Sequence, residues 1–315
     1  MFLDFRMWLF VLVARMSPRL PAFRGRTRIF LLLHSWLGLA HHRLLVDAKM
    51  RRPVEFLVKL DVQSWLQRLA FLTGEYESET VLFLEQLRTC RLDQGYVLDI
   101  GANVGMITIP LALMSKNQSA GGQAVVAVEA VPDNVAALQA NIFLNNLTED
   151  VRVLAVALGE VEKSIFIEVE GGLKAGQGSG TANILPDGSS YECEKQELEL
   201  TTIDHLAESL VLNSGCSVIK IDTDGYDLKV LQGAVDFLAE NRPVIFGEFS
   251  AHCMNWHHQT IEDVQAFAEH HGYRVFFRKN RIFRFSSTLP VSGFVQDLLL
   301  VPNETAEAVR WCIDD

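Results

Sequence analysis

The sequence predicts an α/β protein with a mostly parallel sheet and helices on both faces. Residues 97–100 form an apolar run that a glycine turn and a helical pattern follow at once. The same alternation continues, with strands expected at 123–129 and 151–157 around a helix at 132–145. Alternating strands and helices favour parallel pairing through right-handed crossovers. Ligands of such sheets bind at the carboxyl ends of the strands.

Charge is distributed unevenly along the 315 residues. The chain is 49% hydrophobic, which is enough for one large domain with an appendage. Its net charge is −11, but residues 1–46 contain seven arginines and one aspartate and so carry +6, which leaves −17 for the rest. An enzyme acting on nucleic acid more often has a basic active face. We therefore expect no nucleic-acid substrate.

The first 43 residues form an apolar, basic arm. Its two apolar runs, 7–14 and 29–40, are each shorter than the roughly 20 residues that span a bilayer. Asp4 and the lack of a small-residue cleavage site argue against a signal peptide. Two interpretations stay open: an interfacial helix pair on anionic lipid, or helices packed against the domain or a dimer partner.

Residues 44–95 precede the main domain, which we place at 96–315. A hairpin is expected at 44–60 and helices at 65–72 and 80–92. The acidic loop 74–77 between these helices either covers a ligand or is solvated. Five cysteines without paired spacing fit reduced thiols, and hence a protein that faces the cytoplasm.

The glycine turn after residue 100 is the first candidate binding element. Glycine lets the backbone approach a ligand closely, and a helix start favours anionic oxygens. Gly101 and Gly105 follow a Gly-x-x-x-Gly spacing that weakens a dinucleotide interpretation and suits a cradle for S-adenosylmethionine. Glu129 closes the next strand, where a carboxylate either accepts hydrogen bonds from ribose hydroxyls or caps the following helix.

The second candidate element lies at 218–227. Asp222, Asp224 and Asp227 follow an apolar strand and precede a helix expected at 228–240. Three carboxylates so close together must be solvated, hydrogen-bonded or metal-bound. The substrate that accepts the transferred group would lie beside them. A base for a hydroxyl acceptor would come from Asp222, Asp224, Glu248 or His252.

Histidines and a cysteine follow the strand that ends at Glu248. Cys253, His257 and His258 lack the spacing of a closed zinc site, so we expect no bound metal. The glycine-rich stretch 171–180 is expected to be a loop that closes over the substrate or simply connects two strands. Further strands are expected at 273–277, 281–285 and 294–301.

Over roughly residues 60–280 the chain resembles the FkbM-type family of S-adenosylmethionine-dependent methyltransferases. The resemblance rests on the motifs at 97–105, 202–204 and 219–227, together with Glu129 and the pairs Val230-Leu231 and Gly233-Ala234. It implies a Rossmann-like class I methyltransferase fold with seven strands, the last antiparallel. By this resemblance, Glu129 binds the ribose of the methyl donor, and its amino-acid portion is lined by Asp99, Gly101, Ala102, Asn103 and Gly105.

One departure from the family pattern concerns the second motif. The family usually has Asp-Val-Glu-Gly-x-Glu, whereas this chain has Asp222-Thr-Asp224-Gly-Tyr-Asp227. Both glutamates are thus shortened by one methylene, which puts inherited roles of Asp224 and Asp227 in doubt and affects Asp222 less.

We therefore expect an S-adenosylmethionine-dependent methyltransferase that methylates a hydroxyl of a small molecule or sugar. Membrane contact through the arm and a homo-oligomer stay open. One alternative is a catalytically silent ligand-binding or membrane-adaptor protein on the same fold. A nicotinamide-dependent oxidoreductase is the other, and the missing middle glycine disfavours it.

Overall fold

The structure is a computed structural model, and it describes most of the chain. The described residues are 2–19, 25–39, 42, 44–90, 95–116, 123–169, 182–184, 195–209, 211–212, 215–279, 284–287 and 295–314. The expected loop at 171–180 lies outside them, as do residues 281–283 of one expected strand.

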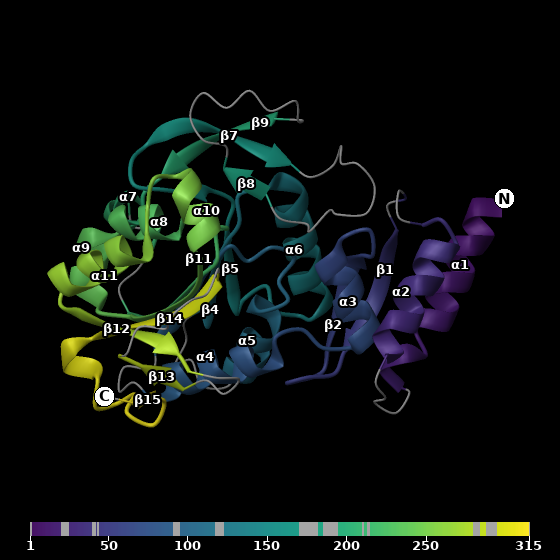
Figure 1. The fold of residues 1–315 in the computed structure, drawn as a ribbon, viewed down its shortest axis with the longest axis horizontal. Coiled ribbons are helices and arrows are strands. Elements are labelled where there is room, and N and C mark those ends of the chain that lie inside the picture. The colour runs from purple at the N-terminus through teal and green to yellow at the C-terminus, as the bar shows by residue number, and fades with distance from the viewer. Residues whose placement is uncertain are drawn as a thin grey trace.

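A mixed sheet of nine strands forms the centre of the main domain (Figure 1). In spatial order the strands are β15 (Ile313–Asp314), β13 (Phe285–Ser286), β12 (Tyr273–Arg278), β14 (Val295–Pro302), β11 (Val244–Ser250), β10 (Cys216–Ile221), β3 (Tyr96–Ile100), β4 (Val125–Val128) and β5 (Val151–Leu154). From β11 to β5 all neighbours are parallel, whereas β14 is antiparallel to both β11 and β12. The seven expected strands are present, and two strands of two residues extend the edge.

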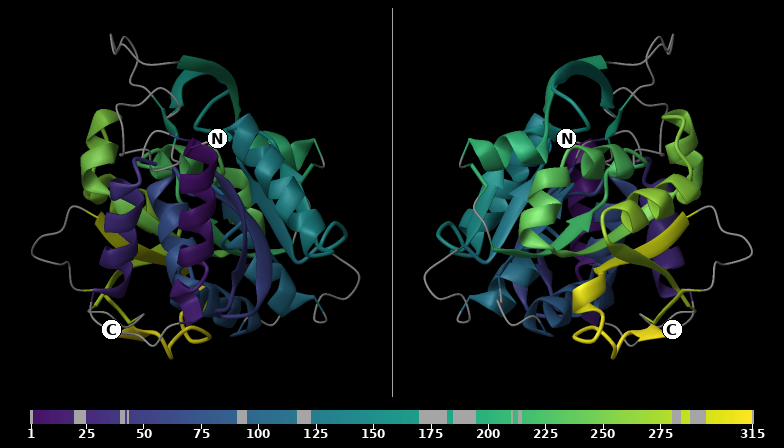
Figure 2. Two further views of the ribbon diagram at one scale, coloured as in Figure 1. Left: turned by 90° about the vertical axis from the view of Figure 1, so that its right-hand side faces the viewer. Right: turned by 90° about the vertical axis from the view of Figure 1, so that its left-hand side faces the viewer.

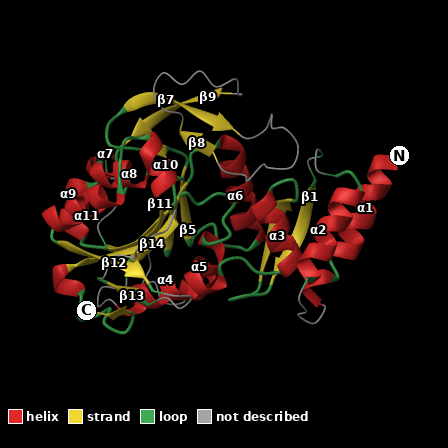
Figure 3. Cartoon of the chain, in the orientation of Figure 1, coloured by secondary structure: helices red, strands yellow, loops and turns green. Residues whose placement is uncertain are grey.

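Helices cover both faces of this sheet (Figure 3). Successive strand residues are buried in different clusters, as period-2 side chains of a doubly covered sheet must be. Val97 belongs to the cluster that contains side chains of α4 (Ser78–Cys90), α5 (Thr108–Ser115) and α6 (Pro132–Leu144). Leu98 belongs to the cluster that contains side chains of α7 (Ile203–Glu208), α8 (Asp227–Gln232), α9 (Val235–Asn241) and α11 (Ile261–His270).

The helix expected at 228–240 is divided into α8 and α9. Gly233 lies between them, where an added Cβ would come within 2.1 Å of the Gly159 carbonyl oxygen. The break depends on this close backbone approach, which apolar periodicity does not reveal. Asp204 of the 202–204 motif stabilises the new helix start, since its carboxylate accepts hydrogen bonds from the backbone N–H groups of Asp236 and Phe237.

A second, smaller sheet lies beyond the carboxyl ends of the parallel strands (Figure 1). It contains β6 (Ala157–Leu158), β9 (Lys195–Thr201), β7 (Lys163–Val169) and β8 (Ala182–Ile184) in that order. Ile165 and Ile167 of β7 are buried and face the same core as the neighbouring strand ends. This sheet therefore forms an apolar cover over the ligand-binding edge of the large sheet.

The segment before β3 packs against the domain. The hairpin of β1 (Leu45–Met50) and β2 (Phe56–Asp61) confirms the expected one, and α3 (Trp65–Thr73) follows it. The arm folds into α1 (Phe2–Ala14), the short 3-10 helix η1 (Ser17–Arg19) and α2 (Arg26–Trp36). One hydrophobic cluster runs through the arm, the hairpin and one face of the sheet. No helix among the described residues is long and apolar enough to cross a membrane.

The remaining short elements complete the C-terminal half. They are α10 (Ala251–Trp256), directly after β11, and the 3-10 helix η2 (Asn303–Thr305), directly after β14. β11 pairs in parallel with β10, so its last residues, including Glu248, lie at the same carboxyl edge of the sheet as the end of β10.

Candidate active site

A cavity of about 150 Å³ lies at the carboxyl ends of β3, β4 and β10. Its polar lining consists of Gln67, Glu77, Asn103, Glu129, Asn134, Lys220, Asp222, Thr223 and Asp224, together with Tyr76. Its apolar lining comes from the strand ends, the small sheet and α3, and includes Ile100, Val131, Leu158, Ile165, Ile167 and Leu66. The cavity therefore lies where ligands bind in parallel α/β sheets.

The turn after β3 brings backbone to the floor of this cavity. Gly101 has a φ of 78°, and a Cβ there would lie 1.9 Å from the Asp222 carbonyl oxygen. Only glycine fits, since the turn is left-handed and in contact with the neighbouring strand end. The backbone N–H groups of Gly101 and Ala102 donate to the Val128 carbonyl, which fixes the turn against β4. Gly105 also has a positive φ of 92° but lies behind the lining residues, next to Leu138.

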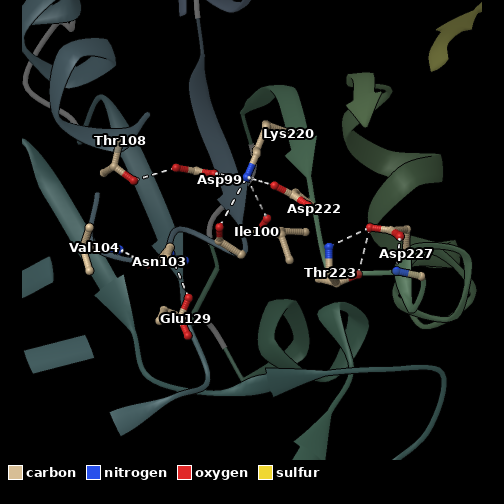
Figure 4. Close-up of polar contacts among 12 residues, drawn as sticks. Asp99, Ile100, Asn103, Val104, Thr108, Glu129, Lys220, Asp222, Thr223 and Asp227 are labelled. Carbon is tan, nitrogen blue, oxygen red and sulfur yellow. Dashed lines mark hydrogen bonds and ion pairs between the residues drawn. The ribbon is translucent and has the colours of Figure 1, made fainter. Parts of the chain in front are cut away.

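Glu129 lines the cavity and also holds two loops together. Its Oε2 accepts a hydrogen bond of 2.8 Å from the Asn103 N–H (Figure 4). Its Oε1 accepts from the Val131 N–H at 2.9 Å and from the Asn134 side chain at 3.4 Å. The capping interpretation of Glu129 is thus present in the structure. It leaves room for a ligand role at Oε2, which accepts from the Asn103 N–H and keeps a second lone pair, whereas Oε1 already accepts two hydrogen bonds.

A buried lysine connects the two motifs. Lys220 Nζ lies 3.4 Å from Asp99 Oδ1 and 3.5 Å from Asp222 Oδ2, and it donates to the Gly101 carbonyl at 3.3 Å (Figure 4). Burial alone would lower the lysine pKa, but Asp99, Asp222 and Glu77 outweigh it and hold that pKa above its ordinary value. The ammonium group therefore stays charged and compensates the carboxylates around it.

Asp99 lies behind the cavity lining. It is fully buried, and its Oδ2 accepts a hydrogen bond of 2.6 Å from the hydroxyl of Thr108, the first residue of α5. Its other oxygen faces Lys220. In this position Asp99 supports the glycine turn from below, whereas Gly101, Ala102 and Asn103 are exposed to the cavity.

Asp227 organises the loop that carries the second motif. It is fully buried; its Oδ1 accepts from the N–H and the hydroxyl of Thr223, and its Oδ2 accepts from the N–H of Gly225. Burial and the nearby Asp222 raise the pKa of Asp227 to about 6. This loop projects Asp222 and Asp224 into the cavity lining, while Asp227 itself points away from it.

Glu248 and His252 lie outside the lining. Burial and the charges of Asp222, Asp297 and Glu77 raise the pKa of Glu248 to about 7. Glu248 is therefore electrostatically coupled to the cavity carboxylates, although it does not line the cavity. The His252 ring packs edge-on against Trp256 at 5.1 Å between ring centres.

The histidine loop makes packing contacts. His257 packs edge-on against Tyr226, and burial lowers its pKa to about 4, so the ring is neutral near pH 7. Cys253 lies against Gly225. A Cβ added to Gly225 would lie 2.4 Å from the Cβ of Cys253. In the part of the chain that the structure describes, no three His, Cys, Asp or Glu side chains are grouped so as to hold a metal ion.

Six polar lining residues were absent from the candidate site derived from sequence. Tyr76 and Glu77 come from the acidic loop, so the alternative in which that loop reaches the ligand matches their position. Burial raises the pKa of Glu77, which Lys220 opposes. The other four are Gln67, Asn134, Lys220 and Thr223. Lys220 could have been singled out as the one cation within an apolar strand that ends in Asp222.

The strand order and the glycine turn at the end of β3 together define a Rossmann-like class I methyltransferase. The chain matches the model of the methyltransferase FkbM domain over residues 99–275, more than half of its length. It therefore belongs to the FkbM methyltransferase family, and its methyl donor is S-adenosylmethionine. No curated protein shows significant similarity to it.

Several solved structures are similar to the chain. Methyltransferase FkbM from Methylobacillus flagellatus KT is 16% identical, with 74% of this chain and 54% of that chain covered and a TM-score of 0.40. TYW2 from M. jannaschii, in complex with AdoMet, is 17% identical, with 82% of this chain and 90% of that chain covered and a TM-score of 0.37. Precorrin-6y C5,15-methyltransferase from Geobacter metallireducens GS-15 is 14% identical, with 71% of this chain and 89% of that chain covered and also a TM-score of 0.37. The chain spans about half the length of the FkbM structure it matches.

The charge of the cavity fits this donor. Its described lining holds four carboxylates, Glu77, Glu129, Asp222 and Asp224, and one lysine. S-adenosylmethionine carries a sulfonium and an ammonium cation, which such an acidic site attracts. The apolar walls from β7 and the strand ends would suit the adenine of such a donor.

Proposed function

We propose that the protein transfers a methyl group from S-adenosylmethionine to a hydroxyl oxygen of a small molecule or sugar. The observation that carries this proposal is the group of cavity carboxylates Glu77, Asp222 and Asp224 beside the glycine turn. A hydroxyl must lose its proton as the oxygen attacks, and a carboxylate can accept that proton. The acidic lining also repels phosphate, which argues against a nucleic-acid acceptor.

The donor would lie across the ends of β3 and β4. Glu129 would accept hydrogen bonds from its ribose hydroxyls, and the backbone at Gly101, Ala102 and Asn103 would contact its amino-acid portion, with Asp99 and Gly105 supporting the turn. When bound, S-adenosylmethionine supplies an electrophilic methyl group on its sulfonium. The protein's own task is then to orient the acceptor oxygen opposite the sulfur and to exclude water.

Asp222 is the residue to which we assign contact with the acceptor. Its side chain is 45% exposed, whereas Asp99 beside it is fully buried, so Asp222 is accessible from the cavity. Glu248 would take up the proton in a further step, since its pKa of about 7 matches a base that is half ionised near neutral pH. Asp224 lines the same wall, and His252 lies farther out, beside Trp256.

A cytoplasm-facing location agrees with the cysteines. Among the described residues, Cys90, Cys253 and Cys312 are thiols that form no disulfide. Thiols that form no disulfide suit a reducing compartment.

The test is transfer of isotope-labelled methyl groups from S-adenosylmethionine to extract fractions enriched in hydroxyl compounds or in amines. We expect a labelled product in the hydroxyl fraction, with the label in a methyl ether that survives acid treatment. The Asp222→Asn variant should not form this product. A label found only in amines would replace oxygen by nitrogen as the acceptor. Tight donor binding without any labelled product would support a catalytically silent protein instead.

A further inference from the structure

The two N-terminal helices present exposed apolar side chains on one face each. Residues spaced by three or four along a helix share a face. The exposed stripes comprise Phe5, Trp8 and Leu12 on α1 and Ile29, Leu32 and Trp36 on α2. Each of these side chains is at least half exposed, and Trp36 reaches 81%. Large exposed apolar patches of this kind mark interaction surfaces.

The opposite faces of both helices are anchored in the core. Phe10, Ala14 and Phe30 are buried in the cluster shared with the hairpin and the sheet. Between the helices, the Ser17 hydroxyl donates to the Leu72 carbonyl of α3 at 2.6 Å. The arm is therefore a folded layer of the protein, and α1 and α2 lie side by side at its surface (Figure 2, left). The apolar stripes are what this layer presents outward.

Charge identifies the partner. Arg15, directly after α1, and Arg28 of α2 are exposed, and residues 1–46 carry +6 while the rest of the chain carries −17. An anionic surface attracts the arm and repels the remaining protein, which favours approach through the arm. Exposed tryptophan, as at positions 8 and 36, is the side chain best suited to a membrane–water interface.

We propose that the α1–α2 face docks on an anionic lipid bilayer, with both helices lying in the headgroup region and their apolar stripes inserted. The helices have 13 and 11 residues, which is too short to span but sufficient to lie in the interface. A second copy of the chain is a poorer occupant, because face-to-face pairing would bring two strongly basic arms together. The proposal stands independently of the methyl acceptor.

The test is co-sedimentation of the full chain with vesicles of phosphatidylserine and phosphatidylcholine, compared with vesicles of phosphatidylcholine alone. We expect binding to the anionic vesicles only. The double variant Trp8→Ser/Trp36→Ser should weaken it by about tenfold or more for each tryptophan. Arg15→Gln/Arg28→Gln should weaken it about fivefold for each arginine.

The matched control is Phe143→Ser, since Phe143 is 74% exposed but lies on α6, outside the arm. It should bind anionic vesicles like the unchanged protein. Surface substitutions are preferable to deletion of the arm, because deletion would remove Phe10 and Phe30 and uncover the core residues of the hairpin and α3 that share their cluster. A thermal melt checks that each variant folds, and the arginine pair tests the proposal even if the tryptophan pair does not.

Three outcomes would overturn the proposal. The first is no sedimentation with anionic vesicles, and the second is equal loss of binding in Phe143→Ser. The third is a dimer in analytical ultracentrifugation that Trp8→Ser/Trp36→Ser dissociates without any vesicle binding, which would assign the face to a second copy.

Discussion

Gly101 is constrained by its backbone conformation and by its neighbour at once. A side chain there meets the Asp222 carbonyl at 1.9 Å, in a left-handed conformation with φ of 78°. The motif at 97–105 is therefore recognisable from sequence, because the glycine requirement is local. Its partner Asp222 lies 121 positions away, and no spacing in the chain reveals that contact.

Gly101→Ala should lower the free energy of unfolding by at least about 3 kcal/mol, since strain and clash act together. The matched control is Gly215→Ala, because Gly215 also has a positive φ, of 97°, but no atom lies within 4 Å of an added Cβ. It should cost only about 1–2 kcal/mol. Denaturant unfolding measures both, and equal losses would contradict the close approach of the two loops.

Asp227→Asn tests the buried carboxylate at the second loop. The pKa of Asp227 is about 6 in the folded protein and 3.8 ordinarily, so the folded state holds its proton more tightly than the unfolded state. The wild type therefore loses stability relative to the variant as the pH rises from about 4 to about 6, by roughly 3 kcal/mol. Urea unfolding of both proteins at several pH values checks this. A stability difference that stays constant with pH would show that Asp227 is not perturbed.

Glu248→Gln tests the proposed base. Because a base must be ionised, the rate of methyl transfer in the wild type should rise as the pH passes through about 7. The variant should lose that inflection and most of its activity at pH 8. A pH–rate profile with an unchanged inflection would remove Glu248 from the reaction.

At the scale of elements, side-chain amides attach the hairpin to the sheet domain. Asn141 of α6 is fully buried, accepts from the Lys59 N–H at 2.7 Å and donates to the Val104 carbonyl at 2.9 Å. One residue thus joins β2, α6 and the glycine turn. The hairpin itself follows from alternating apolar residues, but its docking on α6 does not, because amide groups give no periodic signal.

Asn141→Ala should lower the free energy of unfolding by about 2–4 kcal/mol, since the buried Val104 carbonyl and the partly buried Lys59 N–H lose their partner. Asn145→Ala is the comparison, because Asn145 makes the same kind of contacts with Leu57 at an exposed position. It should cost about 1 kcal/mol or less. Similar losses at both positions would mean that burial does not set the cost.

At the scale of the molecule, the alternation of strands and helices sufficed to predict the parallel sheet and its ligand edge. The motifs at the ends of β3, β4 and β10 also indicated residues that the cavity brings together, Gly101, Glu129 and Asp222 among them. The remaining lining comes from Tyr76 before the sheet and from the small sheet after it, through loop packing that has no local signature. The polar residues that sequence analysis missed therefore lie in a loop, as Tyr76 and Glu77 do, or inside regular elements, as Lys220 of β10 and Asn134 of α6 do.

The central claim is that this cavity binds S-adenosylmethionine through Glu129 and the glycine turn. Isothermal titration calorimetry of the full chain with S-adenosylmethionine tests it most directly, beside Glu129→Ala and with NAD as the competing ligand. The account predicts binding of S-adenosylmethionine, no heat with NAD, and at least about a tenfold loss of affinity in Glu129→Ala. Binding of NAD instead, or unchanged affinity in Glu129→Ala, would contradict it.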